Sequence, residues 1–213
     1  MIQKKSKYTF SFTGASALMA ETLVIAEQFF LLKDWDKVKD AVQDNNLINK
    51  IKKSTLKRKF QEIKKRLELL TTDQLALLIH GSPEEAKAML LLSLLKTYSF
   101  FKDFVIEVIR SKYLLYVNTL TESDYTSFFN SKALTHTELN SITEQTANKV
   151  KQVLFRMLEQ VGIINSVKDG IIIKPFLSDD AITVIINDDA SWLSGFLFAD
   201  VEIRTIKKSS VHG

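Results

Sequence analysis

Apolar residues recur at spacings of three and four along most of the chain, which is the period of amphipathic α-helices. The clearest case is a stripe within residues 54–70, formed by Leu56, Phe60, Ile63, Leu67 and Leu70 after a candidate N-cap at Ser54. Ser82-Pro83-Glu84-Glu85 is a second strong helix start. The same reasoning predicts helices over residues 17–33, 35–45, 72–80, 83–115, 121–130 and 141–161, with a very short one at 135–138.

Three segments predict extended structure instead. Aromatic and polar residues alternate over residues 8–13, which indicates a short strand or extended arm that ends at Gly14, with one face buried in the fold. Isoleucines on both sides of Asp169-Gly170 predict a β-hairpin. Residues 201–206 predict a strand, whereas Ser178 resembles a helix start before a β-branched stretch.

The order of these elements predicts a mainly α fold in two domains. In the N-terminal helical domain, residues 1–117, a short helix, a turn and the helix after Ser54 form a candidate helix-turn-helix. A linker near Asn118 separates it from residues 118–213, where three helices and a small β-hairpin follow the order of a winged-helix-like domain, and the tail comes last.

Composition supports this fold and narrows the function. The chain contains only 6 glycines and 2 prolines, which favours long helices over a many-stranded sheet. It contains no cysteine, so disulfides, thiolate zinc sites and cysteine nucleophiles are excluded, and a reducing cytoplasm is the expected location. No secretory signal and no run of roughly 20 apolar residues is present, so we expect no membrane association.

Positive charge is concentrated in one segment. Residues 50–66 contain nine Lys or Arg residues against the single acid Glu62, although the whole chain has a net charge of only +4. So many like charges on one helix favour a polyanionic ligand, although a solvated helix face is the simpler alternative. The basic residues are Lys50, Lys52, Lys53, Lys57, Arg58, Lys59, Lys64, Lys65 and Arg66.

The helix over residues 141–161 presents a second, milder polar face. Lysine and arginine contact phosphates, whereas asparagine, glutamine and arginine also read base edges. In a winged-helix arrangement this helix would enter the major groove and Lys168 would lie at the wing tip, although winged helices also mediate protein contacts. The outward residues are Gln145, Asn148, Lys149, Lys151, Gln152 and Arg156.

The sequence motifs do not indicate an enzyme. The three histidines are far apart, and paired acids such as Asp179-Asp180 lie at expected helix caps. No glycine-rich phosphate loop and no nucleophile-elbow serine is present. We therefore expect a protein without catalytic residues, cofactor, metal or small-molecule substrate.

Several motifs resemble a known family. The segment Tyr8-Thr9-Phe10-Ser11-Phe12-Thr13-Gly14-Ala15, Asp34-Trp35, Lys96-Thr97-Tyr98 and Val153-Leu154-Phe155-Arg156-Met157-Leu158 resemble the BrxA family of BREX (bacteriophage exclusion) defence systems. The resemblance covers roughly residues 8–178. It implies a non-catalytic, cytoplasmic, DNA-binding accessory protein that acts beside other BREX subunits.

The residues and the resemblance together favour binding of double-stranded DNA, mainly through phosphate contacts. RNA binding by the helical N-terminal domain and a role as a protein–protein adaptor within the defence complex remain alternatives. The candidate nucleic-acid-binding residues are Lys50, Lys52, Lys53, Lys57, Arg58, Lys59, Lys64, Lys65, Lys149, Lys151, Gln152, Arg156 and Lys168.

Overall fold

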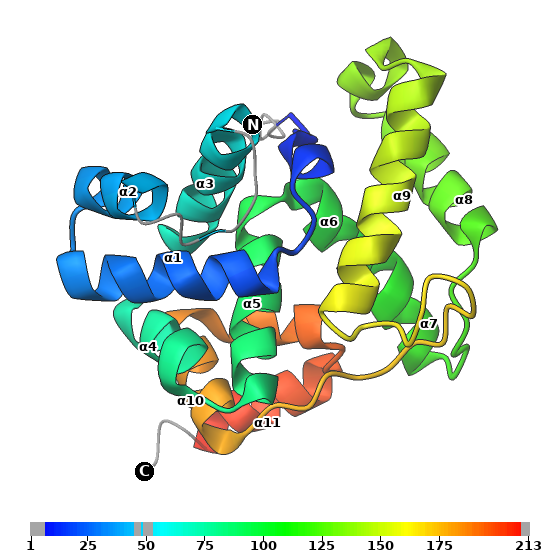
Figure 1. Cartoon of the computed structure of the whole chain (residues 1–213). Coiled ribbons are helices and arrows are strands. Elements are labelled where there is room, and N and C mark those ends of the chain that lie inside the picture. The colour runs from blue at the N-terminus through cyan, green and yellow to red at the C-terminus, as the bar shows by residue number, and fades with distance from the viewer. Residues whose placement is uncertain (1–6, 45–47, 49–52, 210–213) are drawn as a thin grey trace, which may run out of the picture.

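The computed structural model describes residues 7–44, 48 and 53–209 of the chain. It is mainly helical, as predicted (Figure 1). The α-helices are α1 (Met19–Leu32), α2 (Trp35–Asp44), α3 (Lys53–Leu67), α4 (Thr72–His80), α5 (Pro83–Thr97), α6 (Ser99–Phe104), α7 (Ser111–Leu114), α8 (Glu122–Ala133), α9 (Glu144–Gln160), α10 (Asp179–Asp189) and α11 (Asp200–Ser209). The other helical turns are η1 (Ser11–Gly14), η2 (Val105–Arg110), η3 (Thr137–Ser141) and η4 (Ala190–Phe196), of which η2 is a π-helix and the rest are 3₁₀-helices.

Helix α5 lies at the centre of the molecule (Figure 1). It begins with the predicted capping box, in which Ser82 and Glu85 bond each other's backbone N–H groups. Nearly all of its later residues are buried, so it is apolar on every side, as expected of a core helix. Phe100 and Phe104 extend this core to Phe128 of α8 through edge-on ring contacts with centroid distances of 5.4 and 5.1 Å.

The predicted hairpin is reduced to isolated contacts. Among the described residues no regular strand forms, but Ile172 makes an antiparallel bridge with Ile164, and Ile171 makes one with Thr119. Gly162 ends α9 with a φ of +77°, and Gly170 closes the turn with a φ of +64°. The domain boundary near Asn118 stays a prediction.

One extended segment, the second half of another and one helix cap were predicted wrongly. Residues 201–206 belong to α11, because Ile203 and Ile206 pack one helical face onto the core. Residues 11–14 form η1 rather than a strand, because the chain turns there to bury Phe12. Ser54 does not cap α3, which already begins at Lys53.

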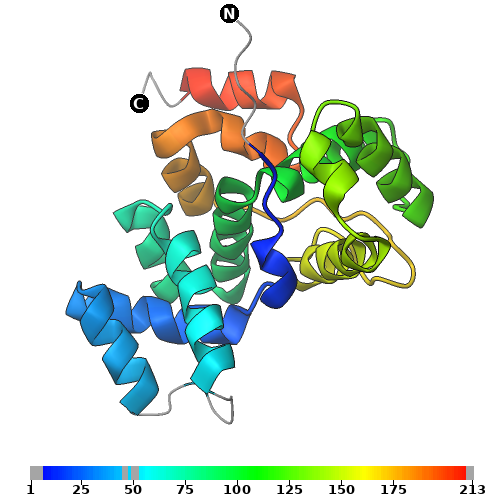
Figure 2. The same cartoon turned by 90° about the horizontal axis from the view of Figure 1, so that it is seen from above.

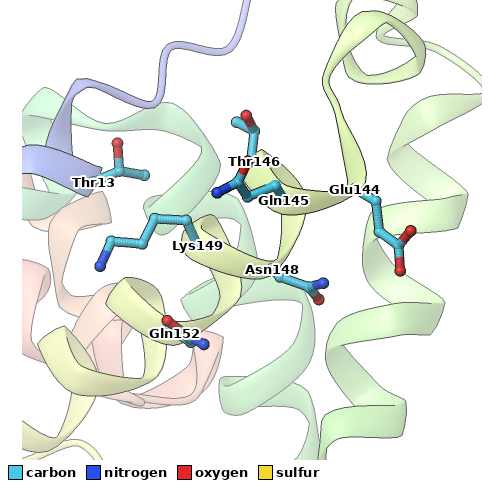
Figure 3. Close-up of a pocket in the computed structure, with 7 residues that line it drawn as sticks. All are labelled: Thr13, Glu144, Gln145, Thr146, Asn148, Lys149 and Gln152. Atoms are coloured by element: carbon cyan, nitrogen blue, oxygen red, sulfur yellow. The ribbon is translucent and has the colours of Figure 1, made fainter.

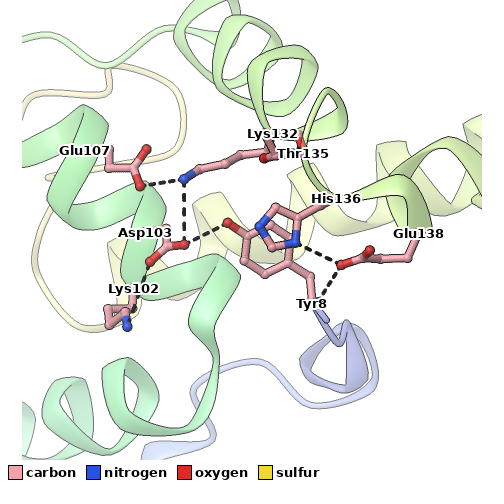
Figure 4. Close-up of polar contacts among 8 residues, drawn as sticks. All are labelled: Tyr8, Lys102, Asp103, Glu107, Lys132, Thr135, His136 and Glu138. Carbon is pink, nitrogen blue, oxygen red and sulfur yellow. Dashed lines mark hydrogen bonds and ion pairs between the residues drawn. The ribbon is translucent and has the colours of Figure 1, made fainter. Parts of the chain in front are cut away.

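The segment before α1, residues 7–18, runs as an arm between the α3 side and the α9 side of the molecule (Figure 2). Its first described contacts involve Tyr8, which is buried as predicted for one face of this segment. The Tyr8 hydroxyl donates a 2.7 Å hydrogen bond to Asp103, and its ring stacks on His136 at a centroid distance of 3.8 Å (Figure 4). The backbone N–H of Tyr8 donates to Glu138, which also contacts His136 Nδ1 at 3.0 Å. The arm is thus anchored to α6 and to the η3 region.

No helix in the described ranges combines the length and apolar character that crossing a lipid bilayer requires.

Candidate nucleic-acid interface

The turn η1 brings the two predicted basic surfaces together. On one side, the guanidinium carbon of Arg58 in α3 lies 3.0 Å from the position that a Cβ atom on Gly14 would occupy. On the other side, Thr13 lines a pocket whose remaining walls come from α9. Arg58 and the polar face of α9 therefore flank the same dipeptide, Thr13-Gly14, although they are about 90 residues apart in the sequence.

The pocket between η1 and α9 is open and has a volume of about 830 Å³. Lys149 extends from α9 toward Thr13, whereas Glu144 points to the opposite side of the helix (Figure 3). All the α9 residues that line the pocket are exposed, so their polar groups are accessible to a ligand. These residues are Glu144, Gln145, Thr146, Asn148, Lys149 and Gln152.

A buried arginine holds η1 in this position. Arg66 was predicted among the surface cations, but its side chain is fully buried. Its guanidinium group donates hydrogen bonds to the carbonyl oxygens of Ala15, Ser16 and Ala17, which follow η1, at distances of 2.6 to 2.9 Å. Arg66 therefore fixes the arm onto α3 and cannot contact a nucleic acid.

The hydroxyl of Tyr98 completes this arrangement. It accepts a 2.9 Å hydrogen bond from Arg66 Nε and donates one of 2.7 Å to Glu62, which also accepts a hydrogen bond from Ser11 of η1. Burial raises the pKa of Tyr98 well above its usual range, and the neighbouring Glu62 carboxylate adds to the rise, although the positive charge of Arg66 opposes it. The phenol therefore stays protonated and remains a donor to Glu62.

Helix α9 is tied to the same arm. The backbone N–H of Ala17 donates a 3.0 Å hydrogen bond to the side-chain oxygen of Gln160, in the last turn of α9. Phe155, on the inner face of α9, packs near Tyr125 of α8 and Phe104 of α6. Both helices beside η1 thus have fixed positions, so the surface between them is preformed.

The cations of α3 differ in how free they are. Lys57 and Arg58 are exposed and form no ion pair with another described residue. Lys59 is paired with Glu21 at 2.8 Å, Lys64 lies 3.7 Å from Glu68, and the exposed Lys65 lies 5.3 Å above the Tyr98 ring. Lys50 and Lys52 lie outside the described residues, and Lys53 is the first residue of α3.

The second predicted surface shows the same division. Four of its residues are exposed, namely Lys149, Gln152, Arg156 and Lys168. The three cations among them, Lys149, Arg156 and Lys168, make no ion pair within the described ranges. Lys151 is half-buried and pairs with Glu122 of α8 at 2.7 Å. Lys59 and Lys151 therefore serve partly to join helices. The accessible cations among the predicted residues that the structure describes are Lys57, Arg58, Lys65, Lys149, Arg156 and Lys168.

Sequence patterns did not indicate that η1 would lie between the two basic surfaces of the candidate interface. Thr13 and Gly14 were read only as the end of an arm, because their contacts come from residues far along the chain and leave no periodic signal. The described residues contain no group of three or more His, Asp or Glu side chains that could hold a metal ion.

Comparison with known proteins gives this fold a family. The model of the BrxA family matches residues 6–189. The "BREX protein BrxA" of Bacillus cereus (strain H3081.97) is 29% identical over 147 residues, which cover 68% of this chain and 74% of that protein. The protein of the same name from Escherichia coli O9:H4 (strain HS) is 24% identical over 166 residues, or 78% of each chain.

A solved structure matches the fold over nearly the whole chain. An uncharacterized protein from Magnetospirillum magneticum superimposes with a TM-score of 0.78, covering 90% of this chain and 98% of its own, at 18% identity. That likeness concerns the fold alone. The family model, in contrast, spans most of the sequence and includes η1, α3 and α9. The chain belongs to the BrxA family.

Proposed function

We propose that this protein is a non-catalytic, double-stranded-DNA-binding member of a BREX phage-defence system that acts in the cytoplasm beside other BREX subunits. The observation that carries the proposal is the position of Thr13-Gly14, between Arg58 of α3 and the polar face of α9. Two basic surfaces that are separate in the sequence thereby become neighbours. A wide cationic surface suits a duplex, which presents phosphates along two strands.

The exposed side chains around η1 support double-stranded DNA as the ligand. Lys57, Arg58 and Lys149 are accessible and are not neutralised by described acids. Glutamine and asparagine side chains beside Lys149 are the groups that bond adenine edges in the major groove. Phosphate contacts from lysine and arginine would supply most of the affinity, which should fall steeply with salt.

The arrangement of residues 118–213 supports a winged-helix-like domain as part of the proposal. Helices α8 and α9 with η3 between them precede the bridged segments around Ile164 and Ile172, in the order expected of three helices and a wing. In this arrangement α9 is the recognition helix. Lys168, in the turn between the bridged segments, would contact the adjacent backbone.

Fluorescence anisotropy with duplex DNA, single-stranded DNA and RNA over a salt series tests the proposal. We expect the tightest binding to the duplex and a loss of binding in the double variant Lys57→Glu, Arg58→Glu. The matched control is Lys207→Glu, Lys208→Glu on α11, at the opposite end of the molecule from η1 (Figure 1). This control variant should bind duplex DNA as tightly as the wild type. It changes the net charge by the same amount as Lys57→Glu, Arg58→Glu, but at positions away from the interface.

Two outcomes would contradict the proposal. Preferential binding of RNA would replace it with the RNA-binding alternative. Absence of binding to every nucleic acid at low salt would leave the adaptor role.

A further inference from the structure

A second concave surface lies between α4 and α10, at the end of the molecule remote from η1 (Figure 1). It is a groove of about 480 Å³. Its apolar floor is formed by Ala76 and Leu77 of α4 and by Val184 of α10, all of which are only partly buried. Asp73, Glu85 and Asp180 supply acidic groups along its edges, and no lysine or arginine of the described chain lines it.

Polar contacts hold this groove open at both ends. At one end, Ser178, the N-cap residue of α10, donates a hydrogen bond to Glu85, whose other carboxylate oxygen accepts from the Ser82 backbone N–H at 2.7 Å. At the other end, the buried Gln74 donates a 3.0 Å hydrogen bond to the carbonyl oxygen of Val184. Lys96 also pairs with Asp188 there at 2.7 Å. Because α10 is bonded to the start of α5 at one end of the floor and to α4 at the other, the walls of the groove are held in position.

The acidic side chains around the groove indicate which class of molecule would bind in it. Asp73 and Asp180 are exposed, and neither forms an ion pair with another described residue. Glu84 and Asp179, which adjoin Glu85 and Asp180 in the chain, are also exposed acids. A nucleic acid would be repelled by this rim, whereas a cationic segment would neutralise it. The apolar floor requires that such a segment also carry an aliphatic side chain.

We propose that the groove between α4 and α10 is a docking site for a cationic, amphipathic segment of a partner protein. An aliphatic side chain of the partner lies on Leu77 and Val184, and its flanking lysines or arginines pair with Asp73 and Asp180. This site is separate from the surface around η1, so it does not depend on DNA binding. With both sites occupied, the protein would connect a duplex to a protein partner.

A peptide-binding experiment tests this proposal. The probe is a fluorescein-labelled helical peptide in which lysines flank leucines on one face, and the comparison peptide replaces every lysine with glutamate. We expect the lysine peptide alone to bind the full-length protein, with an affinity that falls with salt. In methyl NMR spectra, its addition should shift the signals of Leu77 and Val184.

Two variants localise the binding. Thr183→Lys places a cation inside the groove, at an exposed α10 position away from the helix ends. This substitution should lower the affinity for the lysine peptide by at least about tenfold. The matched control, Thr126→Lys on the exposed face of α8, should leave the affinity unchanged. The double variant Asp73→Asn, Asp180→Asn should also weaken binding, without adding any positive charge.

Several results would overturn the proposal. Equal affinity for the two peptides, an unaltered affinity in Thr183→Lys, or NMR shifts confined to residues outside the groove would each do so. Sedimentation velocity provides a further check, since self-association that Thr183→Lys abolishes would identify the occupant as a second copy of this chain.

Discussion

The guanidinium group of Arg66 donates a hydrogen bond of 2.9 Å to the hydroxyl of Tyr98, and neither side chain reaches solvent. Arg66 was expected on the exposed surface of its helix, as one of nine clustered cations, although it was not among the candidate binding residues. Its actual partners are the carbonyl oxygens that follow η1, so it organises the candidate interface without being part of the accessible surface. A buried charge of this kind is tolerated only because its donors are well matched by acceptors.

Removing this arginine should destabilise the protein strongly. In Arg66→Met, the carbonyl oxygens of Ala15 and Ala17 and the hydroxyl of Tyr98 lose their donor, so we expect a loss of about 3 kcal/mol or more in the free energy of unfolding. Urea denaturation followed by circular dichroism measures this loss. The control Arg156→Met, at an exposed position of α9, should change stability by less than about 0.5 kcal/mol. Equal effects of the two substitutions would show that Arg66 does not hold the arm.

Lys149 and Gln152 should contribute to DNA binding in different ways. Lys149→Ala removes one phosphate contact, so the slope of log K against log salt should become shallower by about 0.9. Gln152→Ala should keep that slope but reduce the difference in affinity between duplexes of different sequence, because an amide reads bases rather than phosphates. Anisotropy titrations with several duplexes at four or more salt concentrations separate the two effects. Identical behaviour of the variants would contradict the assignment of roles.

The two glycines with positive φ should respond differently to substitution. Both Gly162→Ala and Gly170→Ala incur the strain of a left-handed backbone, about 1–2 kcal/mol. At Gly170 the new Cβ would also lie 2.2 Å from the carbonyl oxygen of Leu120, whereas at Gly162 the nearest atom is a flexible lysine carbon 3.5 Å away. Thermal unfolding should therefore show a clearly larger loss for Gly170→Ala. A larger loss at Gly162 would mean that the contact between Leu120 and the turn is not close.

Acid should remove the contribution of Glu85 to stability. Hydrogen bonds from Ser178 and then from Ser82 lower the pKa of Glu85 below its ordinary value. A carboxyl group with a lowered pKa stabilises the fold fully above its unfolded pKa of about 4.3, and this contribution disappears as the pH falls through the lower folded value. The stability difference between the wild type and Glu85→Gln should therefore narrow between pH 5 and pH 3 in urea titrations. A constant difference over that range would contradict the assignment.

Local signals in the sequence were sufficient to predict most of the helices. The capping box at Ser82 and the apolar stripe from Leu56 to Leu67 predict α5 and α3, because these signals depend on residues within one or two turns. They failed at α11, where β-branched residues suggested a strand. Its apolar residues lie at helical spacing, and packing of that face outweighs a weak intrinsic preference.

Tertiary position could not be predicted in the same way. No pattern near Arg66 indicates that three carbonyl oxygens, about 50 residues earlier in the chain, approach it. The two cationic surfaces were each predicted, but not that Arg58 and Lys149 would lie on either side of Thr13-Gly14. The acidic groove was missed for the same reason. Asp180 had been read only as part of a helix cap, and Asp73 lies in the predicted helix 72–80, where no local pattern marks it as part of a groove.

The arm before α1 has a consequence for how the molecule folds. Ala17 is joined to Gln160 across 143 positions of the chain, and Tyr8 to Glu138 across 130. During synthesis on the ribosome, α3 can form early, but the arm cannot complete its contacts until α9 has emerged. Contacts of such long range form late and slow the folding reaction. The surface around η1 would therefore be assembled only after α9 has been synthesised, and a nascent chain that displays the cations of α3 would still lack the second half of the proposed DNA-binding face.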